Sequence, residues 1–176
     1  MKKSSFILLA FSICVSTFTI SCRKETGCTN PKALNYTVTA DIDDGSCVFG
    51  GCIDPDSKNY DPFADVDNGS CTYAGSIVFW YGDNVAAKLV VNGITSLTYY
   101  FDGELVGSSA SSVFWTGAPV CGQTGSITVN KELGFYKSLP YTFSVRDQNN
   151  YDIWGGVTTI EANKCIKFEL RWSRRK

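Results

Sequence analysis

"GCTNPKALNYTVTADIDDGSCVF", residues 27–49, is followed almost at once by "GCIDPDSKNYDPFADVDNGSCTY", residues 51–73. The two stretches are identical at 11 of 23 aligned positions, and each carries two cysteines 19 residues apart. A unit of this length buries too little surface to offset the entropy of its chain. We therefore expect a disulfide within each repeat, rather than an apolar core, to decide its fold.

The number and spacing of the cysteines support one disulfide within each repeat. The spacing favours Cys28–Cys47 and Cys52–Cys71, with Cys121–Cys165 joining the last two cysteines of the chain. Six cysteines allow 15 pairings, so a bond between the repeats, Cys47–Cys52, is the open alternative. A metal site is disfavoured because the chain has no Cys-x-x-Cys pair and no histidine.

Each repeat ends in an acidic segment, "ADIDDGSC" at 40–47 and "ADVDNGSC" at 64–71. An EF-hand loop is excluded, because Ile42 and Val66 stand where that loop needs an oxygen ligand. Asp-Gly and Asn-Gly are typical of tight turns with a positive φ at glycine, so we predict turns. Calcium is the alternative cofactor, and its candidate ligands are Asp41, Asp43, Asp44, Asp65, Asp67 and Asn68.

The frame shared by the repeats resembles the GCTDPxAxNYDPxAxxDDGSCxY repeat of secreted and surface proteins of Gram-negative bacteria. That repeat often occurs in tandem beside adhesive modules. The resemblance covers residues 27–73, and the first copy departs from it at Thr37-Val38, where the second keeps Asp61-Pro62. It implies a surface module and carries no catalytic activity.

The N-terminus predicts export. Two lysines precede an apolar run over residues 6–20, which as a helix would span about 22 Å and is too short for a hydrocarbon core of about 30 Å. "TISC", residues 19–22, resembles a bacterial lipobox, with Thr19 in place of the usual leucine. We expect a lipoprotein signal peptide over 1–21, lipidation of Cys22, a lipid-anchored linker over 22–26, and attachment to the outer membrane or cell surface. Simple secretion after cleavage near residue 21 is the alternative.

From residue 75 the chain changes to short apolar runs, at 76–81, 88–91, 97–101, 104–106, 126–129, 141–145, 157–160 and 165–172. The last run alternates apolar and charged residues, as a half-buried strand does. Asn92-Gly93 and Asp102-Gly103 are typical hairpin turns, and no segment has a helical period. We predict a mainly β chain in which an antiparallel, immunoglobulin-like β-sandwich over 75–172 follows the repeats. A barrel is the alternative, and a basic tail over 173–176 ends the chain.

This second half also resembles a small β-domain of lipoproteins from the same bacteria. The resemblance covers roughly residues 97–170 and implies no activity. The residues that carry it are Gly117, Pro119, Cys121, Gly122, Gly125, Tyr141, Phe143, Val145, Trp154 and Cys165.

The amino-acid composition excludes several classes of function. Without histidine the chain has no Ser-His-Asp or Cys-His machinery, and a net charge of −1 gives no reason to expect a nucleic-acid partner. We expect a non-catalytic binding, adhesion or accessory module whose partner is a surface protein or a glycan. For a glycan, Trp115 is the candidate stacking residue, because it lies in a loop-like segment. A glycosidase with only carboxylates is less favoured, since no pair of acidic residues stands out.

Overall fold

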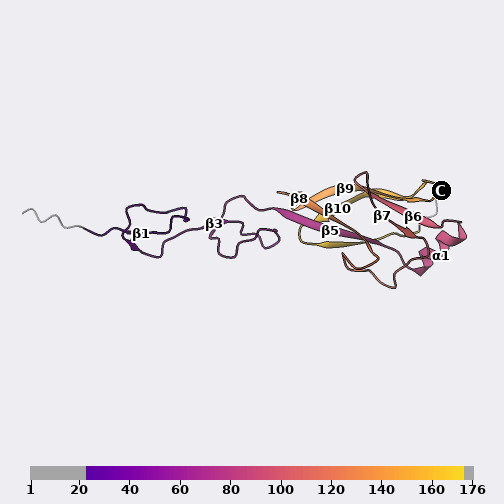
Figure 1. The fold of residues 1–176 in the computed structure, drawn as a ribbon, viewed down its shortest axis with the longest axis horizontal. Coiled ribbons are helices and arrows are strands. Elements are labelled where there is room, and N and C mark those ends of the chain that lie inside the picture. Colours follow the sequence, from indigo (N-terminus) through magenta and orange to yellow (C-terminus); the bar gives the residue numbers. More distant parts are fainter. Residues whose placement is uncertain (1–22, 173–176) are drawn as a thin grey trace, which may run out of the picture. The chain divides into compact units, whose positions relative to one another are not determined.

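The computed structural model describes residues 23–172, so the expected signal peptide at 1–21, the expected lipidation site Cys22 and the expected basic tail at 173–176 lie outside the described residues. The elements are β1 (Thr26–Gly27), β2 (Ile42–Asp43), β3 (Gly50–Gly51), β4 (Val66–Asp67), β5 (Tyr73–Trp80), α1 (Asp83–Val91), β6 (Ser96–Phe101), β7 (Glu104–Ala110), β8 (Ile127–Gly134), β9 (Ser138–Asp147), β10 (Asp152–Glu161) and β11 (Cys165–Glu169) (Figure 1). The chain forms two compact units. One holds most of the first repeat, and the other holds the second repeat with the β-domain.

Each repeat is a short parallel ladder closed by its own disulfide. β1 pairs with β2, and β3 pairs with β4 in the same way. The bonds Cys28–Cys47 and Cys52–Cys71 form as the spacing predicts, so neither cysteine needed for a Cys47–Cys52 bond is free. Large apolar side chains of the repeats, such as Phe63 at 83 % exposed, lie at the surface. The disulfide therefore holds these units together in place of an apolar core.

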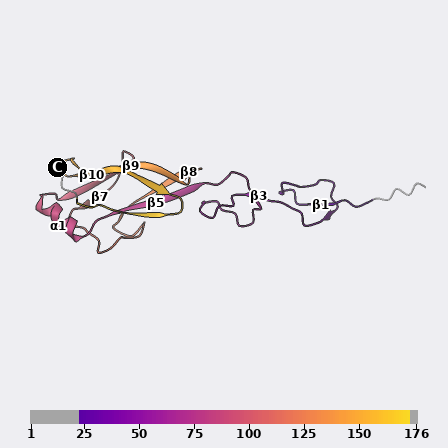
Figure 2. The same ribbon diagram turned by 180° about the vertical axis from the view of Figure 1, so that it is seen from behind.

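Two sheets make the β-domain, in the orders β10-β9-β6-β7 and β11-β5-β8 (Figures 1 and 2). Phe79 of β5 packs against Phe101 of β6 and Phe143 of β9, with ring centroids 6.2 and 5.4 Å apart. This aromatic core between facing sheets confirms the mainly β fold and the sandwich. The three-stranded sheet consists of β5, β8 and β11, which are the first, fourth and seventh strands of the domain. In an immunoglobulin constant domain the smaller sheet is instead formed by the third, sixth and seventh strands. Within that sheet β11 runs parallel to β5, whereas the other pairs of the sandwich are antiparallel.

The expectation of a strand at 88–91 is wrong, because these residues form the second half of α1. Ala86 and Leu89 are three positions apart and both buried, which gives the helix one apolar face. Asn92-Gly93, expected as a hairpin, ends this helix instead. Gly93 has a φ of 72° and donates its amide hydrogen to Val90, while Ile94 donates to Leu89. This is a Schellman motif, which needs the same positive φ as a hairpin turn.

The apolar core does not stop at the expected boundary at residue 75. The second repeat's Cys52 and Cys71, together with Tyr73, belong to the same cluster of buried side chains as the sandwich core. Tyr73 is also the first residue of β5 and pairs with Gly134 of β8. The second repeat is therefore packed as an extension of the β-domain.

Candidate binding groove

Charged side chains tie the second repeat to the β-domain. Asp54 accepts hydrogen bonds from Lys137 Nζ at 2.5 Å and from the Tyr73 hydroxyl at 2.7 Å. Lys58 pairs with Glu132 of β8 at 2.6 Å. Both ion pairs connect the repeat to the region where β8 ends and β9 begins.

The ionisation of Asp54 strengthens this attachment. Donation from Lys137 and from Tyr73 holds the pKa of Asp54 at about 2, below its ordinary value of 3.8. Because the folded-state pKa is depressed, the stabilisation is complete above the ordinary value and is lost as the pH falls through about 2. Asp54 therefore stays ionised, and its contact with Lys137 stays charged on both sides, at neutral and mildly acidic pH.

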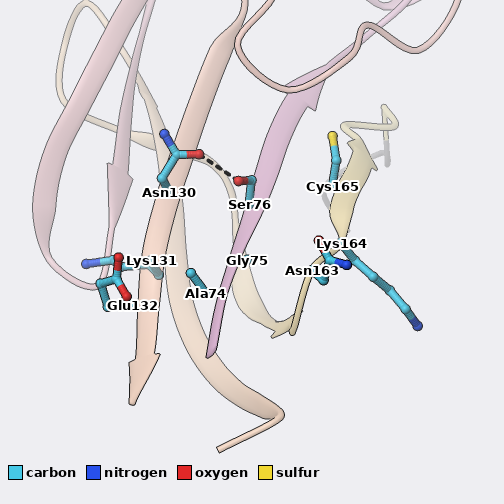
Figure 3. Close-up of a pocket in the computed structure, with 9 residues that line it drawn as sticks. All are labelled: Ala74, Gly75, Ser76, Asn130, Lys131, Glu132, Asn163, Lys164 and Cys165. Atoms are coloured by element: carbon cyan, nitrogen blue, oxygen red, sulfur yellow. Dashed lines mark hydrogen bonds between the residues drawn. The ribbon is translucent and has the colours of Figure 1, made fainter. Parts of the chain in front are cut away.

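A cavity of about 460 Å³ opens beside this attachment and is called here the junction groove (Figure 3). It is lined by three separate segments: the start of β5, the second half of β8, and the turn between β10 and β11. Within the lining, Ser76 Oγ donates to Asn130 Oδ1 at 2.6 Å, and this bond joins β5 to β8. The lining residues are Ala74, Gly75, Ser76, Asn130, Lys131, Glu132, Asn163, Lys164 and Cys165.

The charges in the groove are already neutralised by partners. Lys131 pairs with Glu104 at 3.5 Å, Lys164 pairs with Glu161, and Glu132 pairs with Lys58. The polar groups left to meet a ligand are amides: Asn130 Nδ2 and the side chain of Asn163 have no hydrogen-bond partner within residues 23–172. A volume of this size lies within the range of small-molecule sites. The groove can therefore recognise an uncharged polar molecule.

The acidic segments form the predicted turns. Gly45 and Gly69 have φ values of 74° and 75°. Asp43 and Asp67 each accept the amide hydrogen of the glycine two residues ahead, at 3.0 and 2.9 Å. Asp44 and Asn68 accept in the same way from the serine that follows. Four of the six side chains proposed as calcium ligands thus cap their own turns, while Asp65 accepts the amide hydrogen of Phe49 at 2.8 Å. In the described part of the chain no three His, Cys, Asp or Glu side chains, Asp41 included, are grouped as metal ligands.

We expect millimolar calcium to leave the melting of these repeats nearly unchanged. A specific site would stabilise the native state by about 2.7 kcal/mol at a hundredfold excess over Kd. Asp43→Asn and Asp67→Asn keep a turn-forming side chain and remove the ligand charge, so both variants should melt like the parent. Thermal unfolding of the full chain with calcium and with chelator measures this. A large calcium-dependent rise that both substitutions abolish would contradict the assignment as turns.

Trp115, the predicted stacking residue, anchors its loop. Its side chain is half-buried and lines a cavity of about 10 Å³ together with Trp80 and Tyr81. Its amide donates to the Tyr81 carbonyl at 3.0 Å. Cys121–Cys165 holds the same loop further along the chain. Trp115 is therefore positioned to secure the loop and lies outside the lining of the junction groove.

Two exposed aromatic residues that the sequence did not single out follow β8, one of the strands that line the groove. Phe135 and Tyr136, in the connection from β8 to β9, are 72 % and 65 % exposed. The only signal in the sequence is that two aromatic residues follow Gly134 directly, and no periodicity distinguishes them from strand residues.

Comparison with protein-family models, with curated proteins and with solved structures finds no match. The three disulfides nevertheless indicate an exported protein, because such bonds form and persist in oxidising compartments. Within residues 23–172 no helix has the length and apolar character needed to cross a membrane.

Proposed function

We propose that this chain is a non-catalytic binding module, displayed at the cell surface through a lipid on Cys22. The observation that carries the binding role is the junction groove. It is about 460 Å³ in volume, is lined by amide and hydroxyl groups, and has its charges paired in advance. Such a lining favours recognition of a ligand over chemical change.

The arrangement of acidic groups supports a role without catalysis. Hydrolysis of a glycoside with carboxylates alone needs two of them facing one bond. Among the lining residues Glu132 is the one carboxylate, and its charge is paired with Lys58. In the repeats, Asp43 and Asp67 cap turns, and Asp54 is paired with Lys137.

The order of the parts supports surface display. Cys22 comes immediately before the described residues, and two disulfide-closed repeats separate it in sequence from the sandwich. A lipid at Cys22 would place the whole oxidised, folded part outside the membrane, in the compartment where its disulfides are stable.

Replacing Cys22 tests the anchor. Cys22→Ser should abolish labelling by a fatty-acid analogue and release the protein from the membrane fraction, because the thiol that carries the lipid is gone. Cys14→Ser is the matched control. It removes a cysteine within the expected signal peptide and should leave labelling and membrane attachment intact. Fractionation of cells followed by immunoblotting measures both. Membrane association of Cys22→Ser equal to that of the parent would refute the anchor.

A further inference from the structure

The turn that bears Phe135 and Tyr136 is held firmly. Gly134 has a φ of 60°, and Tyr136 donates its amide hydrogen to Leu133 at 3.1 Å. Lys137, the next residue, pairs with Asp54, and its carbonyl accepts from Ala162 at 2.7 Å. Two largely exposed aromatic rings are thus presented on a backbone that needs little ordering to bind.

Two observations connect this turn to the lining of the junction groove. It continues β8 just after Glu132, a lining residue. Its Lys137 is bonded to Ala162, which immediately precedes the lining residues Asn163 and Lys164. The backbone that carries the aromatic pair therefore adjoins two of the three segments that line the groove.

We propose that the junction groove, with Phe135 and Tyr136 on the adjoining turn, binds an uncharged saccharide. Sugar rings have apolar C–H faces that pack on aromatic rings, and hydroxyls that both donate and accept hydrogen bonds. Asn163 and Asn130 offer amide groups of matching character. This inference rests on the proposed binding function and names its ligand class.

The charge arrangement selects a neutral sugar over an acidic one. The groove's cations, Lys131 and Lys164, are each paired with a glutamate. Figure 3 shows their side chains directed away from the hydrogen-bonded pair Ser76 and Asn130. A uronate or sulfate group would find no unpaired cation among the lining residues, whereas hydroxyl groups would meet the free amides.

The test uses the full chain after signal removal, carrying Cys22→Ser so that it is soluble. Short linear glucans, mannans and galactans on an array are the neutral arm, with alginate and heparin fragments as the charged arm. We expect binding in the neutral arm. For the neutral oligosaccharide with the strongest signal, calorimetry should then show Tyr136→Ala and Phe135→Ala weakening Kd about fivefold or more.

Two further variants locate the site. Asn163→Gly removes the amide while suiting the residue's φ of 54°, and should also weaken binding. Tyr151→Ala is the matched control, because Tyr151 is 65 % exposed like Tyr136 but lies in the turn between β9 and β10, and it should leave Kd within about twofold. The proposal would be overturned if the protein bound only the charged glycans, or bound no neutral glycan. It would also be overturned if Tyr151→Ala weakened binding as much as Tyr136→Ala does. Because the chain tested here has no anchor, those results are independent of the membrane-release test of the proposed function.

Discussion

Gly75→Ala is expected to lower the free energy of unfolding of the β-sandwich by about 3 kcal/mol or more. A Cβ atom at Gly75 would lie 2.2 Å from the Glu161 carbonyl oxygen and 2.6 Å from Ile160 Cγ2. Ile160 is fully buried, and the carbonyl belongs to the backbone of β10. Neither group can therefore move away from the added Cβ without a large cost in free energy. The glycine allows strands from the two sheets to approach closely at the edge of the junction groove.

Gly117→Ala is the matched control, because a Cβ there meets nothing within 4 Å. It should change the free energy of unfolding by about 0.5 kcal/mol or less. Urea unfolding followed by tryptophan fluorescence measures both variants. All four tryptophans lie between residues 80 and 172, so the signal reports on the β-domain alone. Equal stability of the two variants would show that the sheets are further apart at Gly75 than described.

Removing the second repeat's disulfide should destabilise the β-domain, whereas removing the first repeat's disulfide should not. The double variant Cys52→Ser/Cys71→Ser is expected to cost the domain about 2–5 kcal/mol. Both sulfurs lie in the cluster of buried side chains that forms the sandwich core, and Cys52 is 1 % exposed. The first repeat belongs to the other compact unit. Cys28→Ser/Cys47→Ser should therefore unfold that repeat and leave the unfolding of the domain unchanged.

The same fluorescence signal separates these outcomes, since neither repeat contains tryptophan. A domain whose stability is unaffected by both double variants would mean that the sandwich is independent of the second repeat. An equal loss of domain stability in both double variants would mean that both repeats stabilise the domain.

The repeats could be predicted in detail because their information is local. Eleven shared positions and a constant cysteine spacing lead directly to Cys28–Cys47 and Cys52–Cys71. Asp-Gly and Asn-Gly indicate turns whichever residues surround them. The same reasoning failed at Asn92-Gly93, because a positive φ at glycine serves a helix end as well as a hairpin.

The helix was missed for a related reason. α1 has nine residues, and it ends in two valines that prefer strands. Only Ala86 and Leu89 are buried in it, which is too few to set a visible period. Packing against the sandwich decides its conformation, and that packing cannot be read from residues 83–91 alone.

The junction groove could not be predicted because its lining comes from three segments far apart in the sequence. Ser76, Asn130 and Asn163 meet only after β8 and β11 have paired with β5 on opposite sides. Trp115 was visible as a candidate because it lies in a loop-like segment, and its role as a stacking residue stays a prediction. Exposure on a rigid turn, which distinguishes Phe135 and Tyr136, is a property of the folded chain.

Peptide mapping without reduction, on protein recovered from the membrane fraction of cells, tests most directly whether this chain matures as an exported module closed by three disulfides. We predict three linked peptide pairs, containing Cys28–Cys47, Cys52–Cys71 and Cys121–Cys165, with no free thiol among these six. A Cys47–Cys52 peptide would contradict the independent closure of the repeats. Six free thiols, or zinc bound by the cysteines, would contradict export and the disulfide-based fold together.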